Sequence, residues 1–290
     1  MLFMKDKLFC EINPTCYAIS VEKEIIKRHV KDFFGKEKFA TKKCRKLPNV
    51  VSSYQSHLIK RGKGIDPVLQ ENKAVNINIA CKKINGIVIH PGEVFSFCKT
   101  VGRMTKKKGY KEGRVIEGNR IKPGIGGGLC NLGNTIHNLI LHSPLTVTEF
   151  HSHSDALALD EGKRVPFSSG TSVNYNNLDY RFINNTNQDV QILCWCKDDI
   201  LYAQLRSETA FPWRYRLTEE DHHFTKENEK YYRISKIYKE TWDKATGKMI
   251  ARDLVLDNHS EVMFDYDLIP KELIRDESEP KKEKRCYLTT

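Results

Sequence analysis

Three consecutive glycines, Gly126 to Gly128, are followed by Leu129 and Cys130. Glycine adopts backbone conformations that are closed to other residues, so such a run predicts a tight turn. The same freedom lets a bound molecule approach the main chain closely. The turn should therefore present Cys130 at an accessible position.

The segment after the glycines has the apolar periodicity of a helix. Its apolar residues recur on one face at helical spacing, namely Leu132, Ile136, Leu139 and Ile140. This pattern predicts a helix from Cys130 to about His142, because Ser143-Pro144 would stop it there.

Strand patterns follow the helix. Residues 145–153 alternate like a strand, and residues 180–183, 190–196 and 200–205 predict three strands of an antiparallel meander. Upstream, the alternation of residues 75–79 and the apolar run 87–89 flank Asn85-Gly86, a strong hairpin signal. The main domain is therefore expected to open on a β-hairpin.

Residues 1–71 are predicted to form a helical, basic N-terminal segment. Apolar residues at helical spacings from Val21 to Phe34 predict an amphipathic helix, capped by Ser20 and ended at Gly35. Residues 36–73 are basic and thinly apolar, which predicts irregular structure and short helix before a boundary near Asn72.

The rest of the chain divides by pattern into three parts. Residues 72–207 are expected to form an α+β domain of antiparallel sheets with the Cys130 helix packed on them. Residues 208–275 predict a β-rich extension containing one hairpin, formed by residues 231–238 and 249–256. The charge-rich residues 276–290 predict a disordered, solvated tail.

Composition limits the partners that the chain can have. The net charge of +11 suits an acidic partner, such as nucleic acid, anionic lipid or anionic cell-wall polymer, or simply reflects a basic surface. The basic Lys106-Lys107-Lys108 makes no nucleic-acid motif, so no nucleic-acid partner is expected. No N-terminal stretch approaches the roughly 18 apolar residues of a membrane span, and charge interrupts the start too early for a secretion signal. We therefore expect a cytoplasmic protein without stable membrane insertion.

Cys130 is the candidate nucleophile. The chain has 9 cysteines without the spacing of a disulfide framework, which in a reducing compartment predicts mostly free thiols. At a helix start, the helix dipole should lower the pKa of the Cys130 thiol and populate the thiolate. Unpaired N–H groups of Gly126, Gly127, Gly128, Leu129 and Asn131 could hold a developing oxyanion.

The strand after the helix supplies candidate bases. A helix from 130 to 142 is about 18 Å long, and a returning strand covers that distance in five or six residues. His151 and His153 would then lie beside Cys130, with Glu149 on the same face to orient an imidazole. Asn134, one helical turn after Cys130, is a supporting residue.

Other interpretations fit the same residues. A buried, inert cysteine after a glycine turn is common. Cys130, His151 and His153 also match the ligand preferences of zinc, although we expect no metal and no cofactor. Cys194-Trp195-Cys196 is interpreted as part of a strand core.

These motifs together resemble the VanW family of vancomycin-resistance clusters and bacterial cell-envelope proteins, in its stand-alone form. The resemblance spans residues 76–205. It rests on residues 91–97, Val101-Gly102, Gly109-Tyr110, the glycine run with Cys130-Asn131, His153-Ser154 and residues 178–184.

The resemblance implies a role in peptidoglycan metabolism and glycopeptide resistance. In some relatives the cysteine of the GGGxC motif is the nucleophile of a transpeptidase that joins stem peptides, and Cys130 holds that position. His153 matches the histidine of the family's His-Ser pair, which favours it over His151 as the base. The expected partner is a peptidoglycan stem peptide or precursor.

The chain also departs from the family pattern. Asn131 stands where glutamine is usual, and Leu132-Gly133-Asn134-Thr135 replaces a Ser-Thr-Thr run. Residues 169–172 lack the Asp of a Gly-x-Asp-Ala motif. Three hypotheses follow: a cysteine-dependent acyltransferase, which we favour, a non-catalytic accessory module that binds a cell-wall precursor or a resistance enzyme, and a zinc hydrolase.

Overall fold

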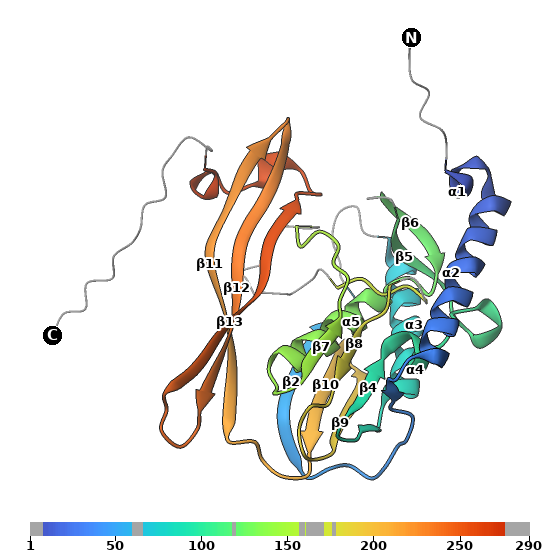
Figure 1. Ribbon diagram of the computed structural model, residues 1–290. Coiled ribbons are helices and arrows are strands. Elements are labelled where there is room, and N and C mark those ends of the chain that lie inside the picture. The colour runs from blue at the N-terminus through green and yellow to red at the C-terminus, as the bar shows by residue number, and fades with distance from the viewer. Residues whose placement is uncertain are drawn as a thin grey trace.

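The computed structural model describes residues 8–59, 66–117, 120–156, 160, 171–175 and 178–275 (Figure 1). The α-helices are α1 (Phe9–Ile12), α2 (Pro14–Phe34), α3 (Pro67–Ile84), α4 (Phe97–Val101) and α5 (Leu129–Leu141), and the 3-10 helices are η1 (Lys106–Lys108), η2 (Tyr266–Leu268) and η3 (Lys271–Leu273). The strands are β1 (Lys38–Phe39), β2 (Asn49–His57), β3 (Ile87–Ile89), β4 (Glu93–Ser96), β5 (Glu112–Glu117), β6 (Arg120–Ile125), β7 (Thr146–Glu149), β8 (Arg181–Ile183), β9 (Val190–Lys197), β10 (Ile200–Ser207), β11 (Trp213–Glu227), β12 (Lys230–Asp243) and β13 (Met249–Glu261). This arrangement confirms the predicted α+β class, with a helical N-terminus and a β-rich C-terminal region. The predicted tail lies outside the described residues.

Four sheets organise these strands. One has the order β1-β4-β8-β7 and a second has the order β2-β10-β9-β3, while β5-β6 is a hairpin and β11-β12-β13 is a separate antiparallel sheet. Strands β9 and β10 pair as predicted, but β8 pairs with β4 and β7 in the other four-stranded sheet. The predicted three-stranded meander is therefore wrong, because Asn184 and the residues after it carry the chain from one sheet to the other.

Helix α3 replaces the hairpin predicted at Asn85-Gly86. Asp66 caps the helix by accepting hydrogen bonds from the N–H groups of Val68 and Leu69 at 2.8 and 3.3 Å, and Pro67 occupies its first turn. At the other end Asn85 is the C-cap and Gly86 takes a φ of 89°. Asn-Gly thus ends a helix here, since an amide residue followed by glycine suits a left-handed helix end as well as a hairpin. The predicted domain boundary near Asn72 falls within this helix.

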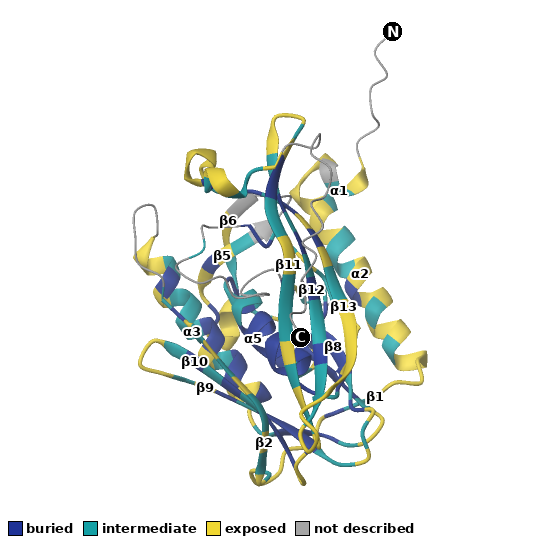
Figure 2. Cartoon of the chain, turned by 90° about the vertical axis from the view of Figure 1, so that its left-hand side faces the viewer, coloured by how far each residue is buried: buried dark blue, intermediate teal, exposed yellow. Residues whose placement is uncertain are grey.

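Helix α5 confirms the prediction made from the apolar periodicity. It begins at Leu129, one residue before the predicted start, and its C-cap is His142. Figure 2 shows α5 as the most completely buried helix of the fold. The Ser52 hydroxyl of β2 donates to the Leu139 carbonyl over 2.9 Å and fixes the helix to the sheet.

The N-terminal segment is less irregular than predicted. Helix α2 is capped by Asn13, whose side chain accepts from the Cys16 N–H over 2.8 Å, so Ser20 lies inside the helix; Gly35 ends it as predicted. Strand β2, predicted as irregular structure, pairs with β10 in the sheet β2-β10-β9-β3, which we call the central sheet. The strand was missed because its serines and Gln55 are polar. Ser52 and Ser56 bond to α5 on one face, and Ser53 and Gln55 face solvent on the other.

The C-terminal region is a three-stranded sheet rather than one hairpin. The predicted strands correspond to β12 and β13, and β11 was missed because its central residues are mostly polar. The sheet stands beside the body of the molecule in Figure 1 and lies in front of it in Figure 2. It is attached through Ile237, which packs on Leu141, and through the Lys239 ammonium, which donates to the Ser143 carbonyl over 2.6 Å.

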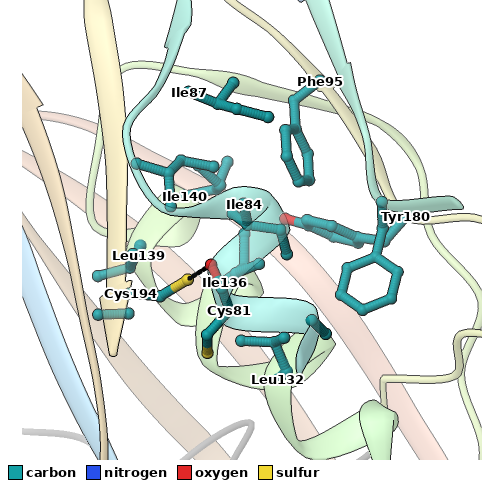
Figure 3. Close-up of a cluster of buried hydrophobic side chains, with 14 of the residues drawn as sticks. Cys81, Ile84, Ile87, Phe95, Leu132, Ile136, Leu139, Ile140, Tyr180 and Cys194 are labelled. Atoms are coloured by element: carbon teal, nitrogen blue, oxygen red, sulfur yellow. Dashed lines mark hydrogen bonds between the residues drawn. The ribbon is translucent and has the colours of Figure 1, made fainter. Parts of the chain in front are cut away.

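One apolar core joins α3, α4 and α5 to both four-stranded sheets. Figure 3 shows Ile84 of α3 and Ile136 of α5 between Phe95 and Tyr180 on one side and Cys194 on the other. Cys194 and Cys81 are buried in this core, which agrees with the interpretation of Cys194-Trp195-Cys196 as strand core. Within the described residues, no helix is long and apolar enough to span a bilayer.

Candidate functional site

Cys130 occupies the second position of α5, directly after the glycine turn. Gly128 is the N-cap and has a φ of 94°, in the left-handed region that favours glycine. Gly126 has a φ of 78° for the same reason. The backbone therefore turns into the helix where the sequence predicted it would.

The glycines are also required by packing inside the protein. A Cβ on Gly127 would lie 2.2 Å from the carbonyl carbon of Gly113 in β5, and a Cβ on Gly128 would lie 2.1 Å from Cγ of Lys73 in α3. The sequence predicted that a ligand would approach the main chain of the glycines closely. In the structure the β5-β6 hairpin and α3 occupy that space. The run fixes the start of α5 against its neighbours.

Asn76 of α3 holds the glycine turn in place and was missed from the sequence. Its Nδ2 donates to the carbonyls of Gly127 and Lys111 over 2.9 and 3.0 Å, and its Oδ1 accepts from the Lys111 N–H over 2.8 Å. Asn76 is fully buried on the helix face that carries Ala80 and Ile84. A polar residue on an otherwise apolar helix face could have pointed to Asn76. The prediction of a strand over residues 75–79 concealed this pattern.

Most of the predicted oxyanion donors are already used. The N–H groups of Gly126, Gly127, Gly128 and Asn131 donate to backbone carbonyls at 3.0 to 3.1 Å. Within the described part of the chain, neither the Leu129 N–H nor the Cys130 N–H donates to a backbone carbonyl, although the Cys130 N–H interacts with its own thiol. These two groups, at the positive end of the α5 dipole, are the ones that can bind a developing negative charge.

The Cys130 thiol differs from the sequence expectation. It is partly buried, and its Sγ lies 3.8 Å from the Val173 carbonyl oxygen, to which it can donate. Burial raises the pKa of the thiol above its ordinary value. The prediction of a lowered pKa is therefore wrong, because desolvation of the buried thiol outweighs the interactions that favour the thiolate at the helix start.

That segment, residues 171–173, separates α5 from the strand that follows it. The Thr171 hydroxyl donates to Oδ1 of Asn134 over 2.9 Å, and Val173 packs at Gly133. On its other edge, the Ser172 N–H donates to the His151 carbonyl over 2.8 Å, and Thr171 pairs with Ser152. The predicted return of residues 145–153 along α5 is thus present in part, with the segment 171–173 lying between the two.

The two candidate imidazoles have different partners. His151 Nε2 lies 2.9 Å from a carboxylate oxygen of Glu149, whereas His153 Nδ1 lies 2.9 Å from the Ser154 carbonyl. Burial lowers the pKa of His153, so this imidazole is neutral near pH 7. No hydrogen bond joins either ring to Cys130 among the residues that the structure describes.

Glu149 belongs to an ion-pair network that anchors α2. Its carboxylate accepts two hydrogen bonds of 2.6 Å from the Arg28 guanidinium and lies 3.5 Å from Nε of Arg181. Arg181 in turn pairs with Asp32 of α2 at 2.9 Å. Although burial opposes ionisation, the bonds from Arg28 and His151 lower the Glu149 pKa to about 2. Glu149 therefore orients His151 rather than His153.

The zinc alternative lacks its ligand cluster. Across the described ranges, no three His, Cys, Asp or Glu side chains are grouped closely enough to hold a metal ion. The His151 ring is hydrogen-bonded to Glu149, and the Cys130 thiol faces the Val173 carbonyl.

Asn131 has a structural contact as well. Its Oδ1 accepts a hydrogen bond from the Ser56 hydroxyl over 2.7 Å, which joins α5 to β2.

Comparison with known proteins gives a consistent result. Residues 72–206 match the family described as VanW like protein. The chain is 24% identical over 218 residues to the vancomycin B-type resistance protein VanW of Enterococcus faecalis, across 75% of this chain and 79% of that protein. It is 29% identical over 154 residues to the uncharacterized protein YoaR of Bacillus subtilis, across 50% of this chain and 49% of YoaR. No solved structure matches the chain. The matched region contains the glycine turn, α5 and Cys130, so residues 72–206 of this chain are VanW-like.

Proposed function

We propose that this chain acts in peptidoglycan metabolism linked to glycopeptide resistance, as a cysteine acyltransferase of the transpeptidase type. The observation that carries the proposal is the position of Cys130 at the start of α5, where the N–H groups of Leu129 and Cys130 donate to no backbone carbonyl of the described residues. The resistance role follows from similarity to the vancomycin B-type resistance protein VanW.

In the proposed reaction the sulfur of Cys130 attacks the carbonyl carbon of a stem-peptide bond. A C–S bond forms while the carbonyl π electrons move to oxygen, and the Leu129 and Cys130 N–H groups stabilise the oxyanion. Collapse of this intermediate breaks the C–N bond and releases the leaving amine, which takes the thiol proton through a base. An acceptor amine or water then attacks the thioester and restores the thiol.

His153 is the proposed base. Its Nδ1 donates to the Ser154 carbonyl, which leaves Nε2 as the proton acceptor, the tautomer that general-base catalysis requires. Because Cys130 and His153 share no hydrogen bond in the described structure, substrate binding has to bring the two groups into proton-transfer range.

An exchange assay tests this function. The full chain is incubated with a stem pentapeptide and an isotope-labelled amino-acid acceptor, and label incorporation is followed by mass spectrometry. We expect incorporation with the wild-type chain and with the exposed-thiol control Cys44→Ala, and none with Cys130→Ala. Equal incorporation by Cys130→Ala would reject the acyltransferase.

One observation favours a second function, a non-catalytic accessory module. The Cys130 pKa is raised by burial, as for a structural cysteine. In that case Cys130→Ala would retain full glycopeptide resistance in a cell that depends on this protein, whereas the acyltransferase predicts its loss.

A further inference from the structure

A cavity with mixed polar and apolar walls lies beyond the end of α5 that is opposite Cys130, next to Pro144. It has a volume of about 660 Å³ and opens where the C-terminal sheet meets the body of the molecule. One wall comes from the loops after β8 and β10, and the other comes from β11, β12 and β13. Figure 1 shows this junction, where the chain passes from β10 into β11. A volume of this size holds a small organic ligand.

Aromatic rings form the apolar part of the cavity. Phe211 and Trp213 lie with ring centroids 6.4 Å apart and planes 13° apart, and Tyr215 lines the same wall. Trp213 and Tyr215 are only partly buried, so their rings are accessible from the cavity. Flat aromatic surfaces of this kind pack against the C–H faces of sugar rings through apolar and dispersion contacts.

Hydrogen-bonding groups surround these rings. Asn187 supplies an exposed amide from the loop after β8, Thr241 supplies a hydroxyl from β12, and Asp253 supplies a carboxylate from β13. These groups offer both donors and acceptors, as the hydroxyl groups of a sugar require. The combination distinguishes the cavity from a purely apolar groove.

Lys239 places a positive charge in the same wall. Its ammonium donates to the Ser143 carbonyl over 2.6 Å and lies 4.7 Å from the Tyr215 ring centroid. Burial lowers the Lys239 pKa to about 8, so the side chain is still mainly protonated at pH 7. With Asp253 opposite in sign, the lining is close to neutral, which suits an uncharged ligand rich in hydroxyl groups better than a strongly charged one.

We propose that this cavity between the VanW domain and the C-terminal sheet is a saccharide-binding site, with Trp213 as its stacking platform and Asn187, Lys239 and Thr241 as its hydrogen-bonding groups. The site is separate from Cys130, and the proposal does not depend on acyl transfer. It assigns the C-terminal sheet a binding role.

Ligand-observed NMR on the full chain tests the proposal. The probes are a β-1,4-linked tetramer of N-acetylglucosamine, maltotetraose and the dipeptide alanyl-alanine. We expect saturation transfer to at least one saccharide and at least a tenfold loss of affinity in Trp213→Ala. The matched control is Trp195→Ala, because Trp195 is 38% exposed on the outer face of the central sheet and stacks on Tyr202.

Two further variants guard against a folding artefact. Asn187→Ala removes an exposed loop amide and should weaken saccharide binding without lowering the melting temperature. Lys239→Met should weaken it also, whereas Lys226→Met, at the exposed far end of β11, should not. The proposal is overturned if neither saccharide binds the wild-type chain at millimolar concentration. It is equally overturned if binding persists in Trp213→Ala and Asn187→Ala, if Trp195→Ala abolishes it, or if only the dipeptide binds.

Discussion

The sulfur of Cys130 lies 3.8 Å from the carbonyl oxygen of Val173, a residue that reaches α5 from a separate segment of the chain. The thiol is buried at the helix start, and this burial raises its pKa. The free protein therefore holds Cys130 as a neutral thiol at pH 7, and the chemistry proposed for it depends on deprotonation after substrate binds.

The first prediction concerns the reactivity of that thiol. Because its pKa is raised, alkylation of Cys130 by iodoacetamide should be slower at pH 7.5 than alkylation of the exposed Cys44, and should accelerate as pH rises above 9. Peptide mapping of the alkylated chain measures both rates. A Cys130 rate that reaches its plateau below pH 7 would show a lowered pKa and contradict this description of the site.

Gly127→Ala should destabilise the fold by steric overlap. The added Cβ would lie 2.2 Å from a backbone carbon of Gly113, which forces the β5-β6 hairpin away from α5 and should cost about 3 kcal/mol. Gly247→Ala is the control, since nothing lies within 4 Å of its Cβ and only the φ of 66° opposes the change, at about 1 kcal/mol. Urea unfolding measures both, and equal losses would reject the packing role of Gly127.

Asn76→Ala should cost about 2 kcal/mol, because it leaves the Lys111 N–H and the carbonyls of Gly127 and Lys111 without the buried Asn76 side chain. Asn78→Ala, at an exposed position of the same helix, should change the free energy of unfolding by less than about 0.5 kcal/mol. Hydrogen exchange at the start of α5 should also accelerate in Asn76→Ala alone. Unchanged exchange there would mean that Asn76 does not hold the glycine turn.

Glu149→Gln should destabilise the chain in a pH-dependent way. The Glu149 pKa is lowered to about 2, so its stabilisation is present above the ordinary carboxylate pKa of 4.5 and is lost as pH falls toward 2. The difference in unfolding free energy between wild type and Glu149→Gln should be on the order of 3 kcal/mol at pH 7 and should vanish near pH 2. Glu229→Gln, which removes an exposed ion pair with Lys226, should have little effect at either pH. A constant difference across this pH range would exclude the proposed ion-pair contribution.

The parts of the fold that the sequence predicts are those determined by local pattern. The helix of α5 and the strands β9, β10, β12 and β13 follow from periodicity within each segment. Helix α3 does not, because Asn85-Gly86 suits a helix end and a hairpin equally. Strand β2 does not, because its partner β10 lies far along the chain.

The same distinction applies to the site. The glycine turn and the position of Cys130 are local and were predictable. The pKa of Cys130 was not, because the Val173 segment that buries it comes from beyond β7. The ion pairs of Glu149 with Arg28 and Arg181 join residues far apart in the sequence, so residue spacing does not predict them.

Intact-mass analysis can detect an acyl-enzyme formed on Cys130. The full chain is mixed with a stem pentapeptide, quenched in acid within seconds and weighed, and the adduct is located by peptide mapping. The acyltransferase predicts a thioester adduct on Cys130 that is absent from Cys130→Ala, retained in Cys44→Ala and released by an added amine. Unmodified wild-type protein, under conditions in which the labelled acceptor is incorporated, or an adduct that persists in Cys130→Ala, would contradict Cys130 as the nucleophile.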